Sequence, residues 1–322
     1  MTFLLRRAIQ GLVVVFLTTT IAFFLIHAAP GEPFAHLLTD PRTTEEMRAA
    51  ERERYGLDRP IPVQYATFVL NVARGNLGES FTHRRPVTSV VAQYAPRTLV
   101  LMATALVVGF AAGIALGSLQ GARPGSWFDR ATGGLAVLIA GLPDFWLALL
   151  ALMLFASTWH LLPGGGIADP ALPATASTAT RLVDLVRHFI LPAGTLTLLI
   201  AATVSRYQRA ALIEVLPDAY LQAARAKGAT RRSVVFRHAL RNAILPIITL
   251  GGLAIPALLG GAVFVEVVFS WPGMGSLTVN AVRDRDYPLV LAVVLLSAVL
   301  VVAAAIVADL VQAAVDPRRR HA

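Results

Sequence analysis

Apolar runs long enough to cross a lipid bilayer are the feature that most limits how this chain can fold. The first run extends from Ala8 to Ala29 and follows Arg6 and Arg7. About 20 apolar residues suffice to cross the ~30 Å hydrocarbon layer as a helix. Hydrophobic residues make up 56% of the chain and charged residues 15%, whereas a soluble domain needs more polar surface. We therefore expect an all-α polytopic membrane protein.

Six membrane spans are predicted along the chain. Their approximate ranges are 8–29, 98–119, 131–159, 188–204, 243–269 and 288–311. Pro143 interrupts the third range, and proline removes a helix hydrogen bond. The next residue, Asp144, is expected either to cap the resumed helix or to face a polar cavity. Small residues in the fifth range, including Gly251, Gly252, Pro256, Gly260 and Gly261, predict close packing against another span or subunit.

Arginine positions predict the orientation of these spans. Arg6 and Arg7 precede the first span, and Arg318, Arg319 and Arg320 close the chain. Basic residues next to spans favour the cytoplasmic side, so both termini are expected there. The first run exceeds the usual apolar core of a signal peptide, which predicts an uncleaved span, although His27-Ala28-Ala29 offers the small residues of a cleavage site as the alternative.

The predicted organisation has four parts. Residues 1–29 form the first span, 30–97 an external helical insertion, 98–315 the membrane core and 316–322 a cytoplasmic tail. Within the insertion, Thr43 and Glu46 form a capping-box pattern. Helices are expected from there to Gly56, from Pro60 to about Gly75, and after Pro86. A cap over the external mouth and a functionless surface segment remain alternatives for this insertion. Residues 161–187 are predicted to be an external loop.

A basic segment at 206–242 lies between the fourth and fifth spans, with Glu214 and Asp218 as its only acids. Asp218 is expected to cap a short helix, and Gly228 suits the left-handed residue that ends one. Thr230 is expected to cap a second, amphipathic helix. Two short helices hinged at a glycine indicate a docking element, although a loop whose arginines only set topology and meet lipid head groups would share its charge.

Several kinds of catalytic or binding site are disfavoured by the residues present. The chain has no cysteine, which excludes disulfides and thiolate metal sites. Lys227 is the only lysine and lacks the neighbours of a phosphate-binding loop. The scattered histidines form no zinc pattern. Asp284 and Asp286 alternate with arginines, which predicts a solvated, self-neutralising segment. The positive charges lie beside apolar runs, which favours membrane orientation over nucleic-acid binding.

Three groups of motifs resemble one protein family. One is Tyr55–Pro60 with Gly75-Asn76-Leu77-Gly78-x-Ser80; another is Ala223–Gly228 with His238–Asn242 and Pro246. The last is Phe269–Pro288, which contains Trp271-Pro272-Gly273-x-Gly275 and Arg285-Asp286-Tyr287-Pro288. Together they are similar to the permeases of ABC importers, in the dipeptide/oligopeptide/nickel branch. Gln222 stands where the wider family motif places a glutamate, which puts in question only an ionic contact at that position.

The resemblance implies a type I ABC importer permease in a bacterial-type plasma membrane, forming half of a pore for di- or oligopeptides. The implied partners are a second permease, two cytoplasmic ATP-binding subunits that carry ATP and magnesium, and an external solute-binding protein. This chain would bind no cofactor and catalyse no reaction. Nickel complexes or other small solutes, and an ion-coupled secondary transporter, are the alternatives. The implied ATPase-docking residues are Asp218, Tyr220, Gln222, Ala223, Ala224, Lys227, Gly228 and Pro246.

Overall fold

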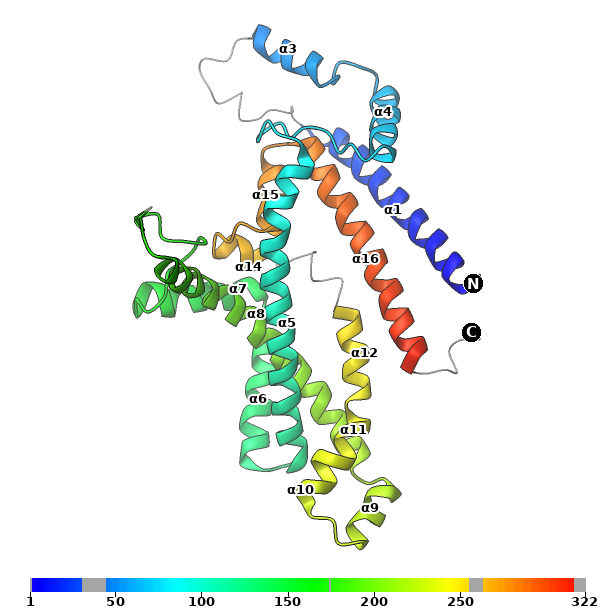
Figure 1. Cartoon of the computed structure of the whole chain (residues 1–322), viewed down its shortest axis with the longest axis vertical. Coiled ribbons are helices and arrows are strands. Elements are labelled where there is room, and N and C mark those ends of the chain that lie inside the picture. Colours follow the sequence, from blue (N-terminus) through cyan, green and yellow to red (C-terminus); the bar gives the residue numbers. More distant parts are fainter. Residues whose placement is uncertain (1, 31–44, 174, 255–262, 316–322) are drawn as a thin grey trace. The chain divides into compact units, whose positions relative to one another are not determined.

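The computed structural model describes residues 2–30, 45–173, 175–254 and 263–315. Within these ranges the regular elements are helices, apart from an isolated antiparallel bridge between Glu79 and Pro86 (Figure 1). The chain divides into two compact units. Unit 1 comprises Met1–Arg97 and Gly273–Ala303, and unit 2 comprises Thr98–Pro272 and Ala304–Ala322.

Four of the described helices are long and apolar enough to cross a membrane. They are α1 (Thr2–Ala28), α5 (Val87–Ala122), α8 (Thr178–Val215) and α16 (Tyr287–Val315). A further pair, α6 (Trp127–Gly141) with α7 (Asp144–Ala151) and the π-helix η1 (Leu152–Thr158), meets the same criteria together but is bent by 108°. The described part of the chain thus contains four helices that could span a membrane, or five if the bent pair is one span, against the six predicted. The prediction of an all-helical, multi-span protein is confirmed.

The fifth predicted span lies partly outside the described residues. Helix α12 (Leu245–Ala254) precedes 255–262, and α14 (Val263–Val268) follows them. The predictions for Pro256, Gly260 and Gly261 therefore lie outside the described residues. Gly251 is described, and a Cβ atom placed there would lie 3.4 Å from the Phe110 ring. Gly251 therefore contacts another helix at an ordinary van der Waals distance, without the close backbone approach expected there.

The insertion in unit 1 contains two of the three predicted short helices. Helix α3 covers Glu45–Arg54 and ends before Gly56, which has a φ of +67°, while α4 covers Ile61–Ala73 and ends before Gly75, which has a φ of +78°. The predicted capping residue Thr43 lies outside the described residues.

The prediction of a separate short helix after Pro86 is wrong. Helix α5 begins at Val87 and continues through Pro96 to Ala122. In unit 1, Val87 and Val90 are fully buried in a cluster with residues of α15 (Met274–Arg283) and α16. Packing of this kind offsets the single backbone hydrogen bond that a proline removes, so the helix persists.

The helix that contains the predicted fourth span is longer than that span. Helix α8 begins at Thr178, ten positions before the predicted start, because the Ser177 hydroxyl accepts a hydrogen bond from the Thr180 amide at 3.1 Å. That cap satisfies a first-turn donor and fixes the helix start. Residues 178–187 are thus helical, although the expectation of an external loop included them.

In unit 2 a row of glycines on α5 lets α8 approach closely. A Cβ atom at Gly109, Gly113 or Gly117 would lie 2.7, 2.6 or 2.4 Å from the nearest atom of Ile200, Val204 or Ser205, respectively. At Gly117 that atom is a backbone carbonyl oxygen, so no side-chain rotation can relieve the overlap. Small residues at four-residue spacing allow this approach of two membrane helices.

Candidate functional site

The predicted docking segment folds as a short helix, α9 (Ala219–Ala226), at one end of unit 2 (Figure 1). Asp218 occupies the N-cap position, as expected. Its carboxylate makes no capping hydrogen bond, however; its main-chain carbonyl accepts instead from the Leu221 and Gln222 amides, at 3.0 and 3.2 Å. The Asp218 side chain is exposed, where water competes for its oxygens. The prediction of a side-chain cap at this position is therefore wrong.

Gly228 ends this helix in the left-handed conformation, with a φ of +83°. Lys227 is the C-cap residue and donates its amide to the Ala223 carbonyl at 3.1 Å. The Ala229 amide reaches the Ala224 carbonyl at 3.1 Å. No atom lies within 4 Å of a Cβ placed at Gly228. The glycine is therefore needed here for its backbone conformation and not for space.

The second predicted helix is also present. The Thr230 hydroxyl accepts from the Ser233 amide at 3.3 Å and caps α10 (Arg231–Ser233). The chain continues as the π-helix η2 (Val234–Ala239) and as α11 (Leu240–Ala243). Pro246 is exposed and is the second residue of α12.

A buried apolar cluster fixes these short helices to α8. Its buried members are Ala211, Leu212, Leu221, Val234, Val235, Ala239 and Ala243. Leu221, Leu212 and Val234 are fully buried, which makes Leu221 the anchor of α9. Two further hydrogen bonds hold α9: Gln222 Nε2 donates to the Pro217 carbonyl, and Asn242 Nδ2 donates to the Tyr220 hydroxyl, both at 2.9 Å.

The opposite face of α9 is open to contact. Ala223 and Gln222 are exposed, Tyr220 is 41% exposed, and Ala224 is half-buried. The structure thus places the predicted docking residues from Asp218 to Gly228 on or beside α9, with Ala223 exposed and Leu221 buried, whereas Pro246 lies on α12.

The predicted kink at Pro143 and Asp144 coincides with the 108° bend between α6 and α7. Pro143 is the N-cap residue of α7, and Asp144 Oδ1 accepts from the Phe145 amide at 2.8 Å. The half-buried carboxylate thus bonds to the first turn of the resumed helix.

Two of the motifs predicted to be external meet in unit 1 at a buried carboxylate. Asp286 is fully buried, and its Oδ2 accepts from the Ser80 hydroxyl at 2.5 Å and from the Thr82 amide at 3.0 Å. Its Oδ1 accepts from the Leu289 amide at 3.2 Å, which caps the first turn of α16. The prediction of a solvated, self-neutralising segment is therefore wrong for Asp286. Alternation of charge along the sequence could not show that one of the four residues points inward.

The turn that carries Ser80 depends on the glycines of the same motif. Gly75 and Gly78 have φ values of +78° and +81°, and the Gly78 amide donates to Asn76 Oδ1 at 2.9 Å. The remaining motif of this region packs alongside, because the Tyr55 and Phe81 rings lie 4.5 Å apart and Phe81 clusters with Tyr287. Pro288 packs near Gly78: the Pro288 Cβ atom lies 3.6 Å from the position that a Cβ atom on Gly78 would occupy.

The Trp271–Gly275 motif is divided between the two units. In unit 2, Trp271 is buried in an apolar cluster, its ring 5.6 Å from that of Phe189, and half-buried Pro272 follows. In unit 1, Gly273 and Gly275 are buried at the start of α15, where the Gly273 amide donates to the Ser276 hydroxyl at 3.1 Å.

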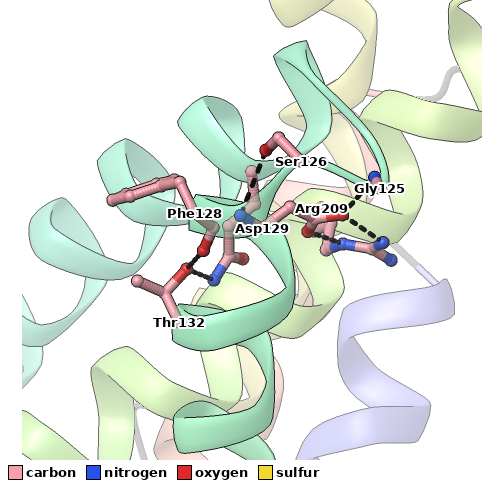
Figure 2. Close-up of polar contacts among 7 residues, drawn as sticks. Gly125, Ser126, Phe128, Asp129, Thr132 and Arg209 are labelled. Carbon is pink, nitrogen blue, oxygen red and sulfur yellow. Dashed lines mark hydrogen bonds and ion pairs between the residues drawn. The ribbon is translucent and has the colours of Figure 1, made fainter.

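Sequence reasoning missed an ion pair that joins α6 to α8 (Figure 2). Asp129 is buried, and its two oxygens accept from Nε and Nη2 of Arg209, at 2.5 and 2.9 Å. Asp129 Oδ2 also accepts from the Gly125 amide, while the Ser126 hydroxyl accepts from the Asp129 amide. Serine followed three residues later by an acid is a capping-box pattern, and this signal could have located Asp129.

A second missed carboxylate lies in unit 2. Glu266 on α14 is fully buried and accepts from the Thr98 hydroxyl at 2.7 Å. Its neighbours along the helix are valines. A buried carboxylate in an apolar helix is costly and is retained where its hydrogen bonds are met.

Within the described residues no group of three or more His, Cys, Asp or Glu side chains could hold a metal ion. The candidate site in unit 2 is the exposed face of α9 with Gly228, and the second candidate, in unit 1, is the cluster around Asp286.

Two family models match nearly the whole chain. Residues 113–321 match "Binding-protein-dependent transport system inner membrane component", and residues 1–102 match the N-terminal model of the same membrane component. The chain is 36% identical to the oligopeptide transport system permease protein AppB of Bacillus subtilis, over 98% of both chains. It is 37% identical to the dipeptide transport system permease protein DppB of Escherichia coli, over 99% of this chain and 98% of that one. A glutathione transport system permease protein, GsiC of E. coli, is 33% identical over 99% of both chains. The chain therefore belongs to the family of binding-protein-dependent transport system inner membrane components, as a multi-pass permease of the ABC transporter class.

Proposed function

We propose that this chain is one of two permease subunits of an ATP-driven importer and forms half of its translocation pore for di- or oligopeptides. The observation that carries the coupling part of the proposal is α9, an anchored helix with an exposed small-residue face. Ala223 and Ala224 would let an ATPase subunit approach the α9 backbone closely, and Gly228 would set the direction of the chain beyond it.

The proposed mechanism is a rigid-body switch. Closure of two ATPase subunits would displace α9, and the buried cluster around Leu221 would transmit that displacement to α8. Helix α9 would move together with α8, because a close-packed interface shifts as a rigid body and does not deform gradually. ATP and magnesium would be held by the ATPase subunits, and this chain would act without catalysis.

The proposed arrangement keeps both termini cytoplasmic and residues 30–97 external, next to a solute-binding protein. In this arrangement the membrane core covers 98–315 and contains the cytoplasmic docking loop at 206–242. The cytoplasmic tail is 316–322. In this arrangement the Asp286 cluster fixes the turn that carries Ser80 to the start of α16 and so gives the insertion a defined surface.

Peptides are the proposed solutes because relatives of near-equal length are named for oligopeptide and dipeptide transport. The glutathione-named relative supports small peptide-like solutes as a second candidate class.

The test is ATP hydrolysis by the complete complex in lipid vesicles with its binding protein. Dipeptides, tripeptides, longer peptides, glutathione and a nickel chelate would be compared. We expect stimulation by one peptide class. Stimulation by the nickel chelate alone would make a nickel complex, and not a peptide, the proposed solute. A chain that co-purifies with no ATP-binding subunit would overturn the proposal.

A further inference from the structure

A basic pocket of about 490 Å³ lies on unit 2, beside the turn that joins α5 to α6 and next to α10. Its polar lining includes Arg123, Arg231 and Arg232, and its apolar lining includes Leu119, Val235 and Phe236. None of its lining residues is acidic. The pocket is separate from α9, none of whose residues lines it.

The three arginines come from two segments far apart in sequence. Arg231 Nη2 donates to the Ala122 carbonyl at 2.8 Å, which fixes the start of α10 against the end of α5. Arg123 and Arg232 are exposed, and neither takes part in an ion pair among the residues that the structure describes. The nearby Asp129 is already bound by Arg209. The pocket thus presents uncompensated positive charge.

Apolar side chains surround this charge and remain exposed. Trp127 is 83% exposed, Leu119 51%, and Phe128 and Phe236 40% each. Tryptophan at this exposure beside membrane-crossing helices is typical of the membrane–water interface. An inorganic anion or an acidic protein patch would gain nothing from such walls.

We propose that this pocket binds the head group of an anionic phospholipid. Arginine guanidinium groups pair with phosphate through charge-assisted hydrogen bonds, and basic pockets beside membrane helices bind acidic head groups. The glycerol and first acyl carbons would lie along Leu119 and Phe236. The inference uses the proposed function only for orientation, because it places this end of unit 2 at the cytoplasmic leaflet.

The occupant would stabilise the geometry that α9 depends on. Val235 lines the pocket and is also a buried member of the cluster that anchors Leu221. A bound lipid would therefore hold η2 and the α5–α6 turn together beneath the docking helix.

The experiment measures lipid retention by native mass spectrometry of the purified, delipidated complex. Phosphatidylglycerol and phosphatidylcholine with identical acyl chains would be titrated separately. The test variant is Arg123→Gln with Arg232→Gln, which leaves the hydrogen bond of Arg231 intact. The control is Arg237→Gln with Arg241→Gln, which removes the same charge from exposed arginines outside the pocket.

We expect tighter retention of phosphatidylglycerol and a loss of about 25-fold in its affinity in the test variant, since each arginine that pairs directly with the bound head group contributes roughly fivefold. The control should stay within about twofold. Equal loss in both variants, or equal retention of both lipids, would overturn the proposal. Loss of ATPase subunits from the test variant with lipid retention unchanged would assign the arginines to that partner instead. Lipid retention needs neither ATP nor peptide, so a failure of peptide import leaves this result standing.

Discussion

The Ser80 hydroxyl donates to the Asp286 carboxylate across 206 residues of sequence. That one contact joins the turn at the end of the insertion to the N-terminus of α16. Both residues belong to motifs that the sequence alone marked as external, and the structure gives those motifs a common physical role. Ser80 and Asp286 are both fully buried, so each must find its partner within the protein.

We expect Asp286→Ala to destabilise unit 1. The substitution leaves the Ser80 hydroxyl, the Thr82 amide and the Leu289 amide without their acceptor, and a buried unsatisfied group costs about 1–3 kcal/mol. The measurement is the thermal unfolding midpoint of the purified complex. Asp284→Ala is the control, because Asp284 is half-buried two positions away. An equal midpoint for both variants would contradict the assigned role.

Gly228→Val should uncouple ATP hydrolysis from transport. Valine is poorly suited to the φ of +83°, so the substitution would redirect the chain beyond α9. Gly228→Asn is the matched control, since asparagine tolerates the left-handed region. The ratio of solute transported to ATP hydrolysed in vesicles would fall for valine and not for asparagine. Normal coupling in the valine variant, at normal membrane levels, would remove the proposed role of this residue.

Gly117→Ala should weaken the contact between α5 and α8. Its methyl group would lie 2.4 Å from the Ser205 carbonyl oxygen, so the helices must separate, and overpacking of this kind costs about 1–3 kcal/mol. Gly133→Ala on α6 is the control, because nothing lies within 4 Å of its Cβ position. Resistance to detergent-induced unfolding would distinguish them, and equal resistance would mean that α5 shifts freely.

Arg209→Gln should destabilise unit 2 more than the double variant Asp129→Asn with Arg209→Gln. The single change leaves a buried carboxylate that has lost two charge-assisted bonds, a loss of about 1–3 kcal/mol, whereas the double change removes the buried charge as well. Thermal unfolding of the wild type, both single variants and the double variant gives the coupling free energy. A double variant no more stable than Arg209→Gln would contradict this account.

Sequence patterns predicted the elements that rely on local chemistry. Gly228, Thr230 and the bend at Pro143 are where their residue types placed them, because a positive φ, a hydroxyl cap and a missing amide act within a few residues. The predictions for the long helices were wrong at the helix starts. The start of α5 at Val87 depends on packing against α15, which no local pattern encodes.

Buried charges were the other feature that the sequence could not predict. The sequence analysis predicts a solvated Asp286 and singles out neither Asp129 nor Glu266, since the partners of all three lie 80 or more residues away along the chain. Only Asp129 carried a local signal, through its spacing from Ser126. Tertiary pairing of this kind becomes visible only when the helices are placed.

The glycine row on α5 also limits how this protein can move. At Gly117 the nearest atom is the Ser205 backbone carbonyl oxygen, and at Gly109 and Gly113 the nearest atoms belong to the Ile200 and Val204 side chains. Both side chains are β-branched and have one strongly preferred χ1 rotamer in a helix, so they absorb little sliding motion. We therefore expect helices α5 and α8 to move together as one rigid unit along this contact. A displacement applied at one end of α8 would then be shared by α5, and we expect any change in relative helix position to occur elsewhere in the chain.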